Sequence, residues 1–193
     1  SAVSIANDLS PLLLGRILLS GAGGYTLTGS EITLTNQNVA ALIASTNGTH
    51  TLAAPLRVNS SRLVLETRPP ASLVLSSALS GPGGVIANPS ASGCGSVTLS
   101  GANTFTGPVV LGSGTLTVGA LANVSAPNPL GESPADAANL LLGPGTLRLA
   151  GPASSTDRGF SLAPGSGRAA LISVDTNATF EGTVTALSGA FIK

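Results

Sequence analysis

Apolar and polar residues alternate most clearly in the stretch from Gly95 to Gly119. Thr stands between Val97 and Leu99 and between Leu116 and Val118, and Gly follows each short run. A period of two places successive side chains on opposite faces of a strand, so each run is typical of a short, half-buried strand. The apolar members are Val97, Leu99, Val109, Leu111, Leu116 and Val118. The stretch therefore predicts three short strands joined by tight corners.

Apolar pairs recur along the whole chain, with their two members separated by one residue that is predicted to point outward. The pairs begin at Leu12, Ile32, Leu52, Leu73, Val97, Leu116, Leu147 and Ile172, and Ile192 follows at the end. By subtraction, these positions are 20, 20, 21, 24, 19, 31, 25 and 20 residues apart. Spacings of this size are typical of one coil of a three-sided β-solenoid. We predict an all-β fold, a parallel β-helix of about eight coils, in which residues 1–193 form one solenoid segment.

The longest step, of 31 residues, predicts an insertion. Four prolines lie in or beside it, at Pro127, Pro129, Pro134 and Pro144. Such a density of proline is incompatible with ladder strands, so a loop should leave the solenoid between residues 121 and 142 without carrying its core. Ser133 followed by Pro134 and Asp136 resembles a helix start, which predicts a short helical turn inside this loop.

Nine residues around this alternating stretch resemble the passenger-domain repeat of bacterial autotransporters. They are Gly93, Gly95, Leu99, Gly101, Asn103, Gly107, Gly114, Leu116 and Val118. Phe105 replaces the usual Tyr of the repeat, and Cys94 occupies a corner where a thiol is not expected. The resemblance implies a right-handed β-helix that is secreted across an outer membrane as part of a longer protein.

The composition favours a thin aliphatic core and excludes two kinds of partner. Only 8% of the residues are charged and 3% are aromatic, with no Trp or Met, and the formal net charge is zero. Without a run of basic residues the chain is a poor partner for nucleic acid and for an anionic membrane surface. The longest apolar stretch, residues 9–19, is short and interrupted by Pro11 and Arg16, so we expect no membrane span in this segment.

Few residues could carry chemistry. His50 is the only histidine and is expected at a surface or corner, while Cys94 is either a tolerated small thiol or the site of an intermolecular disulfide. The most concentrated charge, Asp157 beside Arg158, is interpreted as a loop ion pair or cap. A polysaccharide-active enzyme would instead depend on Asp157 or Asp175. We predict no enzyme activity, no catalytic, cofactor-binding or metal-binding residue, and no cofactor.

Triplets of the form Thr-x-Thr raise a further alternative, a flat face that binds ice or carbohydrate. They begin at residues 26, 33, 49, 104, 115 and 183. A lattice-binding face needs the triplets at one coil spacing, and these starts are irregular. We therefore favour the β-propensity of threonine as their explanation.

The favoured function is an extracellular structural or display solenoid, resembling the secreted passenger of an autotransporter that serves adhesion or forms a surface stalk. The alternative is a filament or sheath subunit that stacks end to end; a carbohydrate- or ice-binding module and a polysaccharide-active enzyme rank below both. Expected partners are further solenoid coils, from the same longer chain or from other copies, and host or matrix surface molecules. Apolar residues near both ends, residues 12–19 and then Phe191 and Ile192, motivate the first of these partners.

Overall fold

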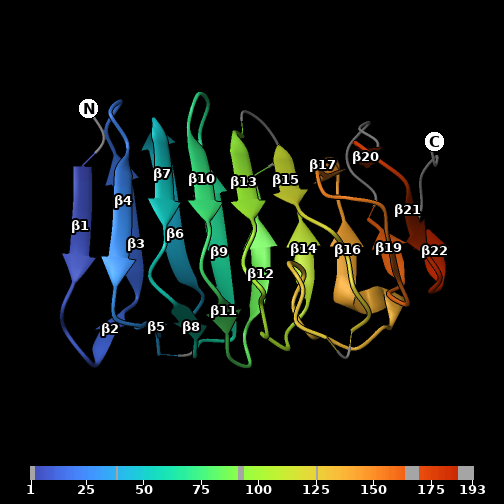
Figure 1. The fold of residues 1–193 in the computed structure, drawn as a ribbon, viewed down its shortest axis with the longest axis horizontal. Coiled ribbons are helices and arrows are strands. Elements are labelled where there is room, and N and C mark those ends of the chain that lie inside the picture. Colours follow the sequence, from blue (N-terminus) through green and yellow to red (C-terminus); the bar gives the residue numbers. More distant parts are fainter. Residues whose placement is uncertain (1–2, 38, 91–93, 125, 164–169, 187–193) are drawn as a thin grey trace.

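The computed structural model describes residues 3–37, 39–90, 94–124, 126–163 and 170–186. These residues form a parallel β-solenoid, in which successive coils lie side by side from β1 (Val3–Asn7) at one end to β22 (Val184–Ala186) at the other (Figure 1). The all-β, parallel architecture predicted from the sequence is confirmed. Each of two sheets contains eight strands, one from each coil.

Three sheets run along the solenoid, and we call them A, B and C. Sheet A contains β1, β4 (Tyr25–Gly29), β7 (Thr49–Leu52), β10 (Ser72–Leu75), β13 (Ser96–Leu99), β15 (Thr115–Val118), β17 (Thr146–Leu149) and β20 (Leu171–Val174). Sheet B contains β2 (Leu12–Leu14), β5 (Ile32–Leu34), β8 (Leu56–Val58) and β11 (Leu79–Ser80). Sheet C contains β3 (Arg16–Ser20), β6 (Ala41–Asn47), β9 (Arg62–Thr67), β12 (Gly84–Ala87), β14 (Val109–Leu111), β16 (Leu140–Leu142), β19 (Phe160–Leu162) and β22. Strands β18 (Ser154–Thr156) and β21 (Ala178–Phe180) form a separate parallel pair.

The predicted register is confirmed from Leu73 to Ile172. Leu73 lies beside Val97, Val97 beside Leu116, Leu116 beside Leu147, and Leu147 beside Ile172, all in sheet A. The spacing between register partners ranges from 19 residues, Ser96 to Thr115, to 31 residues, Thr115 to Thr146. The predicted final anchor, Ile192, and the motif residue Gly93 lie outside the described residues.

In the first third of the chain the predicted register is wrong. Leu12 does pair with Ile32, but in sheet B, where Leu56 follows them. Leu52 belongs to sheet A, where its partner is Leu75 rather than Leu73. The alternating pattern is the same on every face of a solenoid, so it does not distinguish sheet A from sheet B. The inward position beside Leu73 is occupied by His50, which the pattern does not identify as core.

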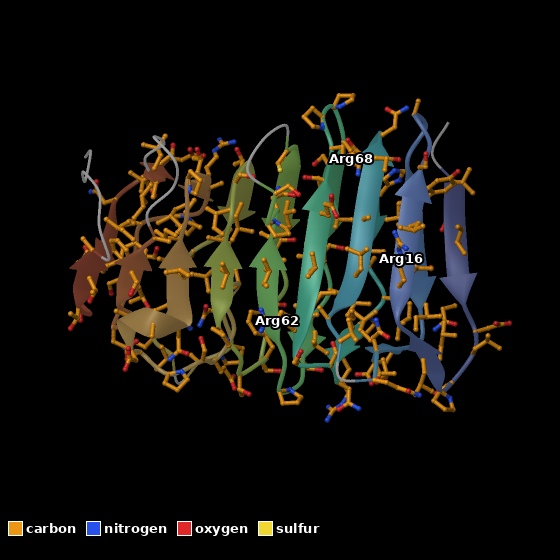
Figure 2. The ribbon with its side chains drawn as sticks, turned by 180° about the vertical axis from the view of Figure 1, so that it is seen from behind. Arg16, Arg62 and Arg68 are labelled. Carbon is orange, nitrogen blue, oxygen red and sulfur yellow. The ribbon has the colours of Figure 1, made fainter. Side chains whose placement is uncertain are left out.

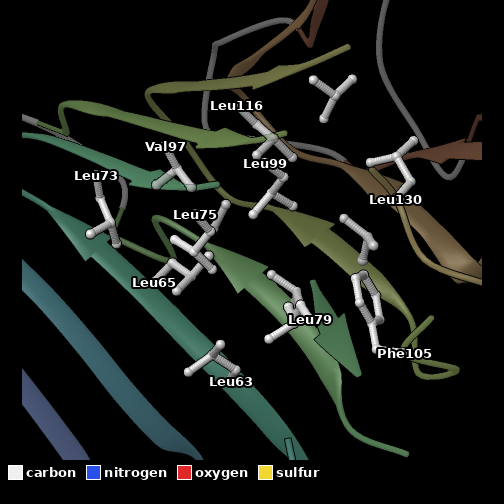
Figure 3. Close-up of a cluster of buried hydrophobic side chains, with 14 of the residues drawn as sticks. Leu63, Leu65, Leu73, Leu75, Leu79, Val97, Leu99, Phe105, Leu116 and Leu130 are labelled. Atoms are coloured by element: carbon white, nitrogen blue, oxygen red, sulfur yellow. The ribbon is translucent and has the colours of Figure 1, made fainter. Parts of the chain in front are cut away.

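The core is a set of aliphatic columns inside the coils. Inward side chains of sheets A and C, including Leu63, Leu73, Val97, Leu99 and Leu116, are fully buried and pack against one another (Figure 3). Because each coil contributes its own layer, the core is as long as the solenoid and needs few aromatic residues.

The Gly-x-Asn-x-aromatic-x-Gly element of the repeat forms a corner after β13, beyond the last strand that sheet B has in the described part of the chain. Asn103 Oδ1 accepts the Leu79 N–H at 2.8 Å, so the buried Asn side chain replaces a strand contact to the previous coil. A Cβ on Gly101 would lie 2.2 Å from the Ser77 carbonyl oxygen, which explains the glycine. Phe105 is fully buried, and unlike a Tyr it brings no hydroxyl that needs a partner.

Among the described residues between Val118 and Leu140, the only regular element is the 3-10 helix η1 (Ala137–Asn139). Asp136 caps it by accepting the Ala138 N–H, so the cap predicted at Ser133 is wrong. The expectation that this segment carries none of the core is also wrong, because Leu121 and Leu130 belong to the core cluster. The prolines prevent this segment from forming ladder strands, but they do not prevent its leucines from packing in the core.

Candidate functional site

The only histidine is buried, which corrects its predicted place at a surface or corner. His50 has no exposed surface and points inward from β7, with its ring stacked on Tyr25 at a centroid distance of 5.2 Å. Its Nδ1 accepts the Tyr25 N–H at 2.9 Å, and Nε2 lies 2.6 Å from the Asn47 carbonyl oxygen. Both ring nitrogens are therefore engaged with the backbone, and His50 is positioned as a core residue rather than as a base.

Asp157 and Arg158 both attach the 119–139 segment to the solenoid. Asp157 Oδ1 accepts the Val124 N–H at 2.9 Å, which ties the residue to this segment. Arg158 is 1% exposed, and its guanidinium donates to Ser133 Oγ at 2.6 Å and to the Gly131 carbonyl at 2.8 Å. Burial lowers the pKa of Arg158 from its ordinary value, and the Asp157 carboxylate opposes part of this change.

Asp175 lies elsewhere, in an exposed pair with Arg148. Arg148 Nη2 donates to Asp175 Oδ2 at 2.9 Å and Nε donates to Oδ1 at 3.3 Å. Both side chains are 40–50% exposed, so the pair contributes no more than about 1 kcal/mol. Within the described part of the chain, no three His, Cys, Asp or Glu residues are grouped to hold a metal ion.

Cys94 is half-buried at the corner before β13. Its Sγ accepts a hydrogen bond from Ser113 Oγ at 3.0 Å and donates to the Ser90 carbonyl at 3.4 Å. The intermolecular disulfide considered from the sequence stays a prediction. Across the described ranges, no helix is both long enough and apolar enough to cross a membrane.

The outer face of sheet A is lined with hydroxyls. Register places Thr49, Ser72, Ser96, Thr115 and Thr146 in one column, and Ser96 Oγ donates to Ser72 Oγ at 2.9 Å. A second column contains Thr26, Thr51, Val74, Thr98, Thr117, Arg148 and Ser173. The Thr-x-Thr triplets themselves are spread over sheets A, B and C, so they do not form the single face that a lattice binder needs.

The outer face of sheet C is different, because its central column is apolar. The residues of this aliphatic column, one from each of β6, β9, β12, β14 and β16, are Leu42, Val64, Ile86, Val110 and Leu141. All five are half-buried. Arg16 precedes the column and Ser161 follows it in register. Arg62 and Glu66 flank it on β9, and Arg68 follows β9; the three arginines are labelled in Figure 2. The column could have been found in the sequence, since the runs Leu63 to Leu65, Val109 to Leu111 and Leu140 to Leu142 do not alternate.

A comparison with known proteins finds one relevant similarity. The chain is 35% identical over 192 residues to the adhesin BmaC autotransporter of Brucella suis biovar 1 (strain 1330). The aligned region covers 96% of this chain but only 5% of that protein. No protein-family model matches the chain, and no solved structure matches it significantly.

The similarity and the fold agree with the repeat pattern. The relative is an autotransporter, and the described residues form the parallel solenoid that a passenger repeat builds. The predicted resemblance to autotransporter passenger repeats is confirmed. The relative is named as an adhesin rather than as an enzyme.

Proposed function

We propose that this chain, a β-solenoid of the autotransporter passenger type, forms a stretch of an adhesive rod displayed outside the cell. The observation that carries the proposal is the 35% identity to an autotransporter adhesin along 96% of the chain. Because the chain spans about 5% of that relative, the adhesive activity of the whole relative comes to this chain only as part of the proposal.

The physical basis of the proposed role is stiffness without cofactors. Every coil is tied to the next by parallel ladders in sheets A and C, and the aliphatic columns continue through the coils. Buried Asn103 and Arg158 use their polar groups to fasten corners and the 119–139 segment. Such a rod holds its side faces at a fixed distance from the cell, which is what surface display and adhesion require.

The side chains that could do chemistry have structural partners, which supports a non-enzymatic role. His50 bonds backbone groups on both sides of its ring, and Asp157 and Arg158 hold the 119–139 segment. Asp175 pairs with Arg148 at the surface. In this proposal the chain acts through its outer faces and binds molecules of the host surface or matrix.

We also propose that further solenoid coils cover both ends, in the same longer chain or from another copy. Ile5 and Val174 belong to the inward columns of sheet A, beside Leu27 and Leu149, yet they are 46% and 49% exposed. Burying the half of each side chain that is still exposed would gain roughly 0.7 to 1.5 kcal/mol. End-to-end stacking of separate subunits, the alternative function, would use the same edges.

Adhesion and display are tested separately. Beads coated with the folded chain should bind host cells or matrix proteins saturably, and soluble chain should compete with them. Beads coated with a Leu116→Asp variant, in which the core is disrupted, serve as the control. Antibody against the chain should label intact bacteria. Labelling only after permeabilisation would contradict surface display, whereas labelling without bead binding would contradict adhesion and leave a spacer role.

A further inference from the structure

The strands that carry the aliphatic column on sheet C have the composition of strands that are buried on both faces. The strands that carry it are apolar on both faces: Leu63, Val64 and Leu65 in β9, and Leu140, Leu141 and Leu142 in β16. Parallel strands with continuous apolar runs occur where both faces of the sheet are buried. The inner face of sheet C packs on the core, while its outer column is half-buried in the chain alone. Strands β13 and β15 of sheet A alternate instead and place hydroxyls outward.

We propose that the aliphatic column is covered by the same column of a second copy of this chain, with the two rods side by side and parallel. The spacing of the side chains favours a second copy over other partners. Neighbouring members of the column lie on paired strands, about 4.8 Å apart, and a second solenoid has the same repeat. Side chains on one face of a helix repeat every 5.4 Å, and those on one face of an extended peptide about every 6.8 Å. Neither spacing matches that of the column, so the side chains of such a partner would not stay in register with it along five coils.

Charge complementarity selects the parallel arrangement. On β9, Arg62 and Glu66 lie two residues before and two residues after Val64, on the same outer face. A two-fold axis along the rods reverses the strand direction across the contact, so Arg62 of one copy faces Glu66 of the other, and the reverse. If the two rods were antiparallel and centred on Ile86, Arg62 would face Pro108 of the other copy and Glu66 would face Gly112. Neither charge would then have a charged partner.

The charges around this pair do not oppose the arrangement. Glu66 makes only a 4.0 Å contact with Arg68, whose side chain is 71% exposed, so Glu66 is available to a partner. Arg16 would face Arg16 of the second copy, but it lies at the end of the column and is exposed, so both side chains can turn into water. The contact comprises five half-buried aliphatic side chains and two ion pairs. A stable interface typically buries about 800 Å² per partner, and this contact consists of a single column of side chains with its flanking charges, so we expect a weak and reversible association.

The test is sedimentation of the 193-residue chain over a hundredfold concentration range. We expect a reversible equilibrium between monomer and dimer. Ile86→Lys should weaken dimerisation at least tenfold, because it places a charge in the centre of the column, whereas Thr98→Lys on sheet A is the matched control and should leave it unchanged. Circular dichroism must show that each variant keeps its strand content.

Charge exchange tests the orientation of the rods. Arg62→Glu and Glu66→Arg should each weaken the dimer severalfold, and the double variant R62E/E66R should recover most of the lost affinity. A chain that stays monomeric throughout the range would overturn the proposal. So would a dimer that tolerates Ile86→Lys, a double variant no better than the single ones, or a dimer abolished by Ile5→Lys at the end of the rod. None of these outcomes bears on adhesion or display, which are tested on beads and intact cells.

Discussion

Replacing Asn103 with Asp isolates the contribution of one buried amide to the solenoid. Asn103 is 1% exposed; its Oδ1 accepts the Leu79 N–H and its Nδ2 donates to the Pro129 carbonyl, both at 2.8 Å. Asn103→Asp keeps the shape and the first hydrogen bond. It replaces the second donor with a carboxylate oxygen that faces the Pro129 carbonyl oxygen, in a place that water does not reach.

The size of the penalty has a ceiling. The variant can avoid a buried charge by keeping the new carboxyl protonated, which costs about 1.36 kcal/mol for each pH unit above its unfolded pKa of roughly 3.9. At pH 7 that cost is about 4 kcal/mol, and a larger penalty would be relieved by proton uptake. Because the Leu79 N–H also stabilises the charged form, we expect a loss of about 2 to 4 kcal/mol.

The pH dependence follows from the direction of the pKa change. Burial raises the pKa of the new carboxyl in the folded state above its unfolded value. The penalty is therefore absent below about pH 3.9, where both states are protonated; it grows as pH rises from there toward the folded-state pKa and levels off above it. Below pH 3.9 the protonated carboxyl can also donate to Pro129, as the amide does. The loss relative to the parent chain should then fall below about 1 kcal/mol.

Urea unfolding of the variant and the parent chain at pH 7, 5.5, 4 and 3, followed by far-UV circular dichroism, measures this difference. Titration of the other carboxylates is common to both proteins and cancels. Asn59→Asp, at an exposed corner, is the matched control and should change stability by less than about 0.5 kcal/mol at every pH. A loss at pH 7 below about 1 kcal/mol, or a loss independent of pH, would refute the reasoning.

Three further substitutions test the core, the buried histidine and the 119–139 segment. Leu99→Asp and Leu116→Asp should each lower the free energy of unfolding, measured in urea, by about 4 kcal/mol or more. Thr98→Ser and Thr117→Ser should each change it by no more than about 0.5 kcal/mol. Equal losses on both faces would mean that the inward and outward residues are misassigned. His50→Leu should lower the free energy of unfolding by about 1 to 3 kcal/mol, because the Tyr25 N–H and the Asn47 carbonyl lose their partner. His50→Gln should lower it by less. A His50→Leu variant as stable as the parent chain would contradict the hydrogen bonds. Arg158→Met should increase the rate of limited proteolysis within residues 119–139 severalfold, and Arg158→Lys should give an intermediate rate. An unchanged rate of cleavage would show that the guanidinium does not hold the segment.

The sequence predicts the fold class, and it predicts the register of sheet A in the later coils, because each described sheet A strand from β13 onward has an apolar pair with one polar residue between its members. It places Val97, Leu116 and Leu147 in one column correctly, since each coil there has one clear apolar pair on sheet A. Earlier in the chain, Leu12 and Ile32 form an equally good pair on sheet B, and His50 interrupts the column on sheet A. Periodicity reports which residues point inward but not which of three faces they belong to.

Contacts between distant residues explain what the sequence does not predict about the 119–139 segment. Its prolines predict that the strands are interrupted. Its attachment depends on Arg158 reaching Ser133 and on Asn103 reaching Pro129, across 25 and 26 residues. Neither contact leaves a periodic signal. The sequence also does not show that Arg158 is buried. An Arg next to Asp157 could equally well be an exposed member of a loop ion pair.

The distance between spin labels along sheet A tests the solenoid most directly. In a Cys94→Ser background, labels at Thr26 and Thr117 are separated by four strand steps, and labels at Thr26 and Ser173 by six. At about 4.8 Å per step, the backbone separations are roughly 19 and 29 Å. Electron paramagnetic resonance should give two narrow distributions whose means differ by about 10 Å, since the 119–139 segment adds residues but only one step. Equal distances, or a broad distribution for the longer pair, would contradict a continuous rod.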